Sequence, residues 1–329
     1  MRIYREGDAS LDGLRCVKVA VIGYGNQGHA HALNLRDSGV EVIVGQREGR
    51  GAERARGDGF EPVSIREAAS LGDLVIVALP DECASEVYDG EIAPGMKSTA
   101  TLGFVHGFNI HFGFIEPAET VDVIMVAPKG PGTLLRSLYE DGNGLPSLMA
   151  VHQDASGRAK QTALGWAAGI GAARAGVVET TFACETETDL FGEQVVLCGG
   201  ISALTKAAFE TLVEAGYEPE FAYLECVHEL KQVVDLLYER GLTGMRDAIS
   251  NTAEYGDLTR GPRLIDDHVR REMKVVLEEI RSGEFARAWM AEHRGGGETF
   301  RRLHDAAADT LYERAGETVR GLMPWLFER

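Results

Sequence analysis

Two pairs of carboxylates in the second half of the chain have the types and spacing of a metal site. Asp189 and Glu193 lie four residues apart, and so do Glu225 and Glu229. On a helix this spacing places both members of a pair on one face, where like charges destabilise an isolated helix by roughly 0.2–0.5 kcal/mol. Two such pairs therefore call for a compensating cation. Carboxylate-only donors favour Mg²⁺ or Mn²⁺ over zinc, and four of them could hold two ions.

The alternative for any single acidic pair is a solvated face, because the chain has 51 Asp and Glu residues. What distinguishes the two chosen pairs is an apolar surround in the sequence. It consists of Leu190, Phe191, Val195, Val196 and Leu197 for the first pair, and Leu224, Val227, Leu230, Val233 and Val234 for the second. These neighbours favour the metal-site interpretation.

A second chemical feature is a glycine turn near the start of the chain, with the sequence Gly23-Tyr24-Gly25-Asn26-Gln27-Gly28. It closes the apolar run of residues 17–22 and opens a helical pattern. In this context the backbone N–H groups of the turn and the positive end of the helix can bind a pyrophosphate. A tight strand-to-helix turn without a ligand is the alternative. Because many chemistries share the motif, the turn predicts a dinucleotide site without naming a reaction.

The elements that must position these residues change in kind near residue 182. Before it, apolar runs alternate with helical patterns, and Ser64-Ile65-Arg66-Glu67 indicates a capping box at a helix start. The apolar runs cover residues 17–22, 40–44, 74–79, 121–127 and 147–151. This alternation predicts a doubly wound α/β fold.

After residue 182 the β-branched runs disappear and long helical patterns take over, at residues 220–240, 262–282 and 298–322. We therefore expect a Rossmann domain over residues 1–181 and an all-helical domain over residues 182–329. The boundary rests only on the change of hydrophobic period.

Composition limits the classes of partner. The formal net charge of −18 argues against general binding to nucleic acid or to anionic lipid. We find neither a secretory apolar segment at the N-terminus nor a stretch of about 18 apolar residues, so a cytoplasmic protein that binds no membrane is expected. The five cysteines contain no C-x-x-C pair, which argues against a disulfide framework and a thiolate zinc site.

Several motifs in a fixed order over nearly the whole chain resemble the ketol-acid reductoisomerase family, in its short form with a single helical domain. The motifs are the glycine turn, Val105-His106-Gly107-Phe108-Asn109-Ile110, Ala127-Pro128-Lys129-Gly130-Pro131-Gly132, the segment from Glu185 to Gln194, Glu229-Leu230-Lys231, the segment from Ile249 to Asp257, and Met323-Pro324-Trp325-Leu326. Any one of them could arise by chance, but their joint order is specific.

The resemblance implies an oxidoreductase with a coupled isomerase step, in valine and isoleucine biosynthesis. An alkyl group migrates within 2-acetolactate or 2-aceto-2-hydroxybutyrate, and a nicotinamide cofactor then reduces the product to the 2,3-dihydroxy acid. Two Mg²⁺ ions would bind the hydroxyl and carbonyl oxygens of the substrate. The residues implied to hold these ions are Asp189, Glu193, Glu225 and Glu229.

The resemblance also assigns roles to three further residues. Ser250 would contact the substrate through its hydroxyl. His106 and Lys129 would lie beside the metals, organise water and move protons. Without the resemblance, a hydrogen-bonded loop histidine and a surface cation are the favoured interpretations of His106 and Lys129.

A homodimer is implied as the minimum active unit. Asp189 and Glu193 of one subunit would face Glu225 and Glu229 of the other. The helical domain would be intertwined and knotted, which no local pattern in the sequence indicates.

The loop of residues 45–54, where a ribose 2′-phosphate would be recognised, departs from the family because it carries no serine and is shorter. Arg47 and Arg50 could clamp a phosphate, whereas Glu48 or Glu53 could accept a hydrogen bond from a free 2′-hydroxyl and repel the phosphate. The two cues conflict. We expect NADH to be preferred, with NADPH or dual use left open.

Two other functions fit part of the pattern. A metal-free Rossmann reductase or hydroxyacid dehydrogenase with a helical dimerisation domain predicts no dependence on divalent metal. A dinucleotide-binding sensor predicts cofactor binding without turnover of acetolactate. The acidic pairs together with His106 and Lys129 argue against both.

Overall fold

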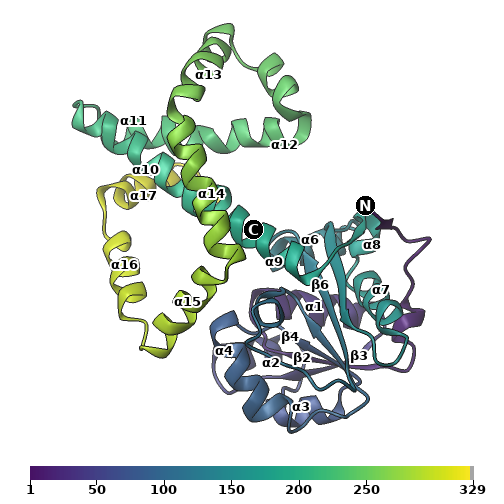
Figure 1. Ribbon diagram of the computed structural model, residues 1–329. Helices are drawn as coiled ribbons and strands as arrows, with labels where there is room; N and C mark the ends of the chain where they lie inside the picture. Colours follow the sequence, from purple (N-terminus) through teal and green to yellow (C-terminus); the bar gives the residue numbers. More distant parts are fainter. Residues whose placement is uncertain (327–329) are drawn as a thin grey trace. The chain divides into compact units, whose positions relative to one another are not determined.

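The computed structural model describes residues 1–326, which fall into two compact units, Met1–Thr188 and a second unit that begins at Asp189 (Figure 1). The predicted boundary at residue 181 lies between the last strand and helix α9 (Phe182–Gly192), whereas the compact units divide inside α9. The first turns of α9 therefore belong to the first unit.

The first unit is built on one eight-stranded sheet with the order β1-β8-β7-β6-β5-β4-β2-β3. The strands are β1 (Ile3–Tyr4), β2 (Lys18–Ile22), β3 (Glu41–Gly45), β4 (Leu74–Val77), β5 (Thr101–Phe104), β6 (Asp122–Pro128), β7 (Ser147–Gln153) and β8 (Val177–Glu179). The five strands from β3 to β6 in this order run parallel, and β7 pairs antiparallel with β6. The predicted α/β fold is confirmed.

Helices cover both faces of this sheet (Figure 1). They are α1 (Asn26–Asp37), α2 (Arg50–Gly57), α3 (Ile65–Leu71), α4 (Asp81–Val87), α5 (Phe108–His111), α6 (Gly132–Glu140), α7 (Ala159–Gly169) and α8 (Ala172–Ala175), with a 3₁₀ turn η1 (Leu11–Leu14) and a π turn η2 (Tyr88–Ile92). Successive strand residues enter opposite cores: Val19 and Val21 pack in one, Ala20 and Ile22 in the other. This is why these strands are apolar throughout rather than alternating.

Two local predictions in this unit are tested by hydrogen bonds and pairing. The Ser64 Oγ accepts a hydrogen bond from the Glu67 backbone N–H at 3.2 Å, so the predicted cap at the start of α3 is confirmed. The chain reverses its winding at β2, which pairs with β3 on one side and β4 on the other. In folds of this kind ligands bind at the carboxyl ends of the strands beside that reversal.

Every regular element described in the second unit is helical, as predicted. After α9 these are the π turn η3 (Glu193–Leu197), α10 (Gly199–Glu214), α11 (Pro219–Tyr223), the π turn η4 (Leu224–His228), α12 (Glu229–Ala248), α13 (Asn251–Leu264), α14 (Asp267–Arg281), α15 (Glu284–Arg294), α16 (Glu298–Ala308), α17 (Leu311–Gly321) and η5 (Pro324–Leu326). A small core of Phe209, Ala222, Tyr223, Ala315 and Val319 packs α10, α11 and α17 together.

Two helices predicted as continuous are divided. Asp266 interrupts the pattern of residues 262–282 because its carboxylate caps the start of α14, accepting hydrogen bonds from the His268 and Val269 N–H groups. Thr310 does the same for α17 within residues 298–322, accepting from the N–H of Glu313. Asp and Thr are favourable N-cap residues, so each starts a new helix at a point where the helical pattern of apolar residues continues without a break.

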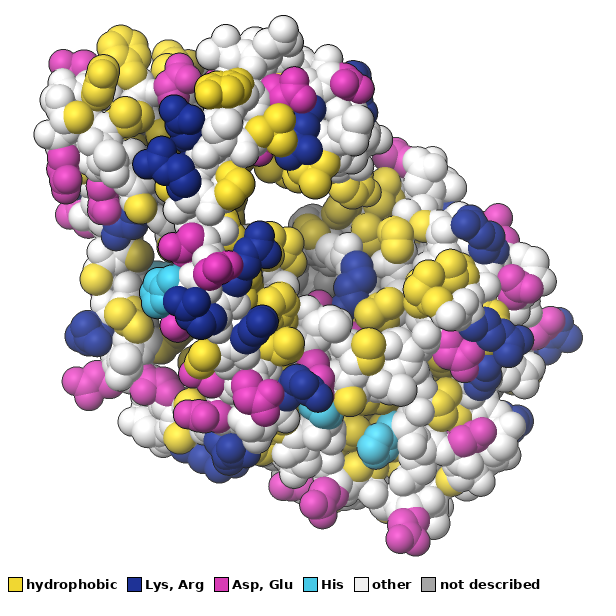
Figure 2. Space-filling model, turned by 45° about the horizontal axis from the view of Figure 1, so that its top comes forward, with side chains coloured by type: hydrophobic (Ala, Val, Ile, Leu, Met, Phe, Trp, Pro, Cys, Tyr) yellow, Lys and Arg dark blue, Asp and Glu magenta, His cyan; other side chains and the backbone are white. Residues whose placement is uncertain are grey.

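The helical stretch Phe182–Glu214 corrects another expectation. It is 33 residues long with a mean hydropathy of 1.4 in its most apolar window, so by length and composition it could cross a membrane. We expect no such stretch from the sequence, and the length and composition of this one contradict that expectation. Only 11% of that window is buried. Acidic and basic side chains are interspersed with apolar ones over the face shown in Figure 2.

Candidate functional site

Glycine is needed at three positions of the turn after β2, for a different structural reason at each. Gly23 has φ +95°, and a Cβ there would lie 2.6 Å from the Ala78 carbonyl oxygen. A Cβ on Gly28 would lie 2.0 Å from the Gly23 carbonyl oxygen, so α1 packs against the turn without room for a side chain. Gly25 has negative φ and no atom within 4 Å of its Cβ position. Its bare backbone therefore borders open space, which fits the approach of a pyrophosphate.

Tyr24 anchors the turn. Its backbone N–H donates to the Gln46 Oε1 at 2.8 Å and its hydroxyl donates to the Asp58 Oδ2 at 3.0 Å. Burial, helped by the carboxylate of Asp58, raises the pKa of the Tyr24 hydroxyl, which stays protonated. Of the residues predicted to bind the cofactor, Tyr24 thus supports the turn from inside the protein.

A pocket of about 470 Å³, which we call the turn pocket, lies over the glycine turn. Its other walls are Gln46, Arg50 and Arg54 on one side and residues 78–80 on the other. Of the two arginines predicted to clamp a phosphate, Arg50 lines this pocket, whereas Arg47 forms an ion pair with Glu91 at 2.8 Å.

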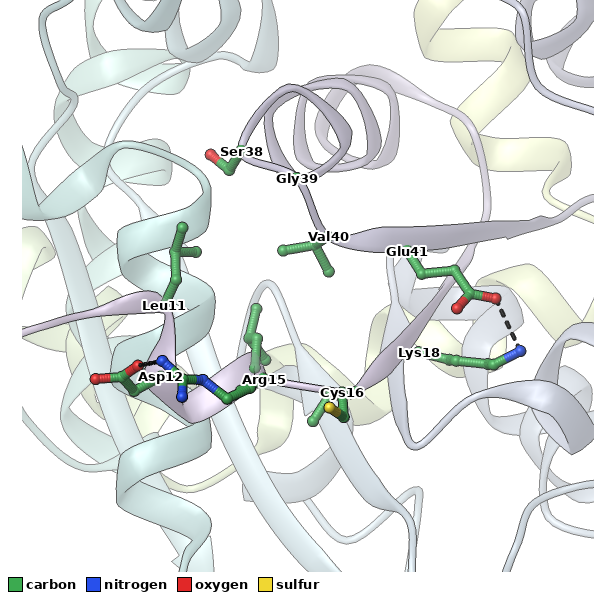
Figure 3. Close-up of a pocket in the computed structure, with 11 residues that line it drawn as sticks. Leu11, Asp12, Arg15, Cys16, Lys18, Ser38, Gly39, Val40 and Glu41 are labelled. Carbon is green, nitrogen blue, oxygen red and sulfur yellow. Dashed lines mark hydrogen bonds and ion pairs between the residues drawn. The ribbon is translucent and has the colours of Figure 1, made fainter.

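A larger hollow of about 550 Å³ lies at the opposite, amino ends of β2 and β3 (Figure 3). Its charged side chains pair with one another, Arg15 with Asp12 and Lys18 with Glu41, both at 2.8 Å. Ligands of doubly wound folds bind at the carboxyl ends of the strands. We therefore place the functional site at the turn pocket and not in this hollow.

His106, Lys129 and Glu185 form a cluster at the carboxyl ends of β5 and β6. The Lys129 Nζ donates to the Glu185 Oε1 at 2.6 Å, and the His106 Nδ1 lies 3.2 Å from the same oxygen. The Gly107 N–H donates to the other oxygen of Glu185 at 3.1 Å. The structure thus brings the two predicted proton-moving residues together on one carboxylate, whose role the sequence analysis missed.

Electrostatics keep that carboxylate charged although it is fully buried. Burial by itself would raise the pKa of Glu185, but the hydrogen bond and charge of His106 and the charge of Lys129 lower it to about 2. A carboxylate beside Nδ1 favours the His106 tautomer with its proton on that nitrogen, which leaves Nε2 as the acceptor of the ring. Glu185 therefore orients both partners.

The cluster is tied to the glycine turn. The Gln27 Nε2 donates to the Gly130 carbonyl oxygen at 3.0 Å. A Cβ on Gly132 would lie 1.8 Å from the Asn26 carbonyl oxygen, so the start of α6, at the end of the loop after β6, packs directly on the start of α1. Lys129 begins this loop. The turn and the cluster therefore share one end of the first unit.

One group of side chains has the composition of a metal site. The donor atoms of His106, Glu185 and Asp189 all lie within 4.8 Å of one another, with Asp189 one helical turn after Glu185 on α9. Among the four predicted metal ligands, Asp189 alone belongs to such a group within residues 1–326. The missed signal was the spacing: Glu185, Asp189 and Glu193 repeat every four residues and form one stripe.

Each acidic pair spans a boundary between an α-helix and a π turn. Glu193 begins η3, and its carbonyl accepts a hydrogen bond from the Cys198 N–H at 3.0 Å. Glu225 lies in η4, and Glu229, four residues later, begins α12. π turns are rare and concentrate at functional sites. In the single chain Glu193, Glu225 and Glu229 are exposed.

Ser250, the predicted substrate contact, caps a helix. Its Oγ accepts a hydrogen bond from the Ala253 N–H at 3.2 Å at the start of α13. A hydroxyl that accepts one hydrogen bond can still donate its own proton. The capping role thus fixes the side chain while leaving that donor for a ligand.

Comparisons with known proteins cover nearly the whole chain. Residues 13–176 match the family described as acetohydroxy acid isomeroreductase, NADPH-binding domain, and residues 182–325 match ketol-acid reductoisomerase, C-terminal domain. An NADH-preferring ketol-acid reductoisomerase from an uncultured archean is 44% identical, with a TM-score of 0.96 over 98% of this chain and 99% of that one.

More distant structures share only the fold. A semialdehyde dehydrogenase NAD-binding protein from Cupriavidus necator, solved with calcium and NAD, is 19% identical, with a TM-score of 0.62 over 81% of this chain and 99% of that one. A putative oxidoreductase from Jannaschia sp. CCS1 is 14% identical, with a TM-score of 0.58 over 80% of this chain and 97% of that one.

Proposed function

Because the chain belongs to the ketol-acid reductoisomerase family, we propose that it takes 2-acetolactate or 2-aceto-2-hydroxybutyrate through alkyl migration and reduction to the 2,3-dihydroxy acid. Its ketol-acid reductoisomerase activity serves branched-chain amino-acid biosynthesis, and the reductant is NAD(P)H. The observation that carries the finer proposal is the cluster of His106, Lys129 and Glu185 beside the glycine turn.

The nicotinamide cofactor supplies the hydride of the second step. Gly23, Gly25 and Gly28 leave the backbone bare, so the turn and the first N–H groups of α1 would hold its pyrophosphate. Asn26 and Gln27 start that helix, and Gln27 ties it to the loop that carries Lys129. We keep NADH as the preferred cofactor, in line with the preference stated for the archaeal relative.

Two Mg²⁺ ions would be held by Asp189, Glu193, Glu225 and Glu229. Bound there, they supply Lewis-acid stabilisation of the charge on the substrate oxygens. Carboxylate oxygens are the donors that Mg²⁺ prefers. The stripe along α9 and the start of η3, together with the π turns, supports this assignment, since Asp189 already lies beside donor atoms of the cluster.

The proton steps fall to His106 and Lys129. The migration begins when the substrate hydroxyl loses its proton, and the reduction ends when the new alkoxide oxygen gains one. The Nε2 of His106 can accept a proton, and the Nζ of Lys129 can donate one. Glu185 is a positioning residue, because its buried charge holds both groups at one end of the first unit. Ser250 would donate its hydroxyl proton to the substrate.

A homodimer would complete the site. Large apolar side chains on the stretch Phe182–Glu214 are exposed in the single chain: Val196 by 57%, Leu197 by 67% and Leu204 by 50%. Several large apolar side chains exposed on one helical stretch favour an interface. Asp189 and Glu193 of one subunit would then face Glu225 and Glu229 of the other. The intertwined, knotted helical domain and a cytoplasmic location belong to the same proposal.

The proposal is tested by following nicotinamide absorbance with 2-acetolactate, with and without Mg²⁺, for NADH and for NADPH. We expect oxidation that requires Mg²⁺ and a higher kcat/KM with NADH. Glu225→Gln should abolish the response to Mg²⁺. Glu278→Gln, which removes an exposed charge from α14, is the matched control and should retain it.

Absence of metal-dependent oxidation with either cofactor would overturn the proposed function. A strong preference for NADPH would overturn the cofactor assignment alone. Full activity of Glu225→Gln would remove that residue from the metal site.

A further inference from the structure

One buried amide side chain joins the wall of the turn pocket to the loop that carries His106. Asn109 of α5 is 2% exposed, and its Nδ2 donates a hydrogen bond to the Asp81 carbonyl oxygen at 3.0 Å. Asp81 begins α4 directly after residues 78–80, which line the turn pocket. Asn109 itself follows His106 closely in the sequence. A single hydrogen bond therefore connects the segments that follow β4 and β5.

The two connected segments serve different parts of the reaction. The segment after β4 belongs to the cofactor side, because the Ala78 N–H donates to the carbonyl oxygen of Ile22, just before the glycine turn, at 2.9 Å. The segment after β5 carries His106, which shares Glu185 with Lys129. Hydride must reach the same substrate carbon whose oxygen these two side chains protonate. The relative position of the two segments therefore matters for the reduction.

Apolar packing alone leaves this relative position loosely defined. Ile110 of α5 and Ala84 and Val87 of α4 belong to one apolar core, so the two helices already pack together. The hydrophobic contribution to such packing is non-directional. A hydrogen bond requires one distance and one direction between donor and acceptor. The amide of Asn109 supplies that direction.

The second polar atom of Asn109 shows that core stability does not explain this residue. Its Oδ1 is buried and accepts no hydrogen bond from any group within residues 1–326. A buried acceptor without a donor costs free energy, which an apolar side chain of the same size avoids. Asn34 of α1 differs, because its amide donates to the Ile170 carbonyl oxygen at 3.2 Å and accepts from Arg136 at 2.9 Å. Local departures from optimal stability are expected at functional sites.

We propose that Asn109 is a positioning residue, which holds the α4 side of the turn pocket at a fixed position relative to His106. The nicotinamide and the proton-moving side chains then act on the same carbon. Asn109 affects the rate of hydride transfer more than the affinity for the cofactor. The proposal rests on the proposed function, because it takes the turn pocket as the cofactor site and 2-acetolactate as a substrate.

The first test measures initial rates of the full-length protein with 2-acetolactate, Mg²⁺ and NADH. Asn109→Ala should lower kcat by about tenfold or more, because small displacements of reacting groups cost up to about 100-fold in rate. The Kd of NADH, measured by fluorescence titration, should change little. Asn109→Leu fills the space of the amide without the hydrogen bond, so it should show the same loss of kcat and a melting temperature no lower than that of Asn109→Ala.

A second measurement separates positioning from folding, using NADH with deuterium at the transferred position. If hydride transfer is slower in Asn109→Ala, it limits turnover more strongly, and the kinetic isotope effect on kcat should exceed that of the wild type. A smaller fraction of folded protein would lower kcat without changing the isotope effect. Asn34→Ala is the matched control, since it removes another buried amide that donates to a backbone carbonyl. It should lower the melting temperature and leave the isotope effect unchanged.

Three outcomes would contradict the proposal. A wild-type kcat in Asn109→Ala, or a lower kcat with an unchanged isotope effect, would overturn it and leave the proposed function intact. The same change of isotope effect in Asn34→Ala would also overturn it, because any buried amide would then have this effect. A wild-type protein that oxidises neither NADH nor NADPH with 2-acetolactate would overturn the proposed function and this proposal together.

Discussion

Glu185 determines how the two proton-moving residues are presented, since one buried carboxylate contacts Lys129, His106 and the Gly107 N–H. The sequence shows Glu185 only as one acid among 51 acidic residues. Its contacts join residues 56 and 79 positions apart, so they depend on the topology of the sheet. Local spacing could supply the stripe on α9 but not these partners.

Replacing Glu185 by Gln keeps the shape and removes the charge. We expect kcat with 2-acetolactate to fall by about 100-fold or more, the range for loss of organised acid–base catalysis, with a smaller change in KM. Glu187→Gln is the control on the same helix, because Glu187 lies 3.3 Å from the His111 Nε2 and outside the cluster. Equal losses in both variants would assign Glu185 a general structural role.

His31 gives the first unit a sensitivity to acid. The Trp166 Nε1 donates to its Nδ1 at 2.9 Å, and burial lowers the pKa of His31 from 6.5 to about 3. Below pH 6.5 His31 is protonated in the unfolded chain but stays neutral in the folded protein. The free energy of unfolding therefore decreases as the pH falls towards 3, by up to about 1.4 kcal/mol per pH unit. Denaturant unfolding at pH 7.5 and 5 measures this.

The matched variant for that measurement is His31→Gln, which carries no titrating ring. Its stability should fall less between pH 7.5 and 5 than that of the wild type. The same pH dependence in both proteins would show that other groups cause the loss.

At the scale of elements, the turn between β2 and α1 has one glycine that is needed for packing, Gly28, and another that is needed for cofactor binding, Gly25. Gly28→Ala forces a Cβ to within 2.0 Å of a backbone oxygen and should destabilise the fold by about 1–3 kcal/mol. A Cβ at Gly25 meets no protein atom within 4 Å, so Gly25→Val should leave the melting temperature nearly unchanged while weakening cofactor binding. Fluorescence titration with NADH measures the latter. A large loss of stability in Gly25→Val would contradict this division.

The sequence pattern predicts some of these elements and not others. Strands β2 and β4 are continuous apolar runs and were expected. β5 was missed because Thr101 and Gly103 interrupt its pattern, although Gly103 is required where Trp166 packs: a Cβ there would lie 2.9 Å from the indole. The π turns η3 and η4 were missed because one extra residue per turn barely alters an apolar period.

At the scale of the whole molecule, the shared site predicts complementation. Asp189→Asn and Glu225→Gln should each be inactive alone. In a mixed dimer one site would carry both substitutions and the other neither. Random pairing makes half of the dimers mixed, so co-expressed subunits should recover about a quarter of wild-type activity. Recovery of none would place all four carboxylates of a site on one chain.

The position of Glu185 on α9 determines where the chain can be cut to produce the cofactor-binding half alone. A cut after Thr181 matches the change from strands to helices, yet it would remove Glu185, the carboxylate that accepts the hydrogen bond of the Lys129 ammonium. A cut after Thr188 retains that counter-ion. Chimeras that combine the two halves of different relatives should therefore have their junction inside α9, although the sequence shows no change of pattern there.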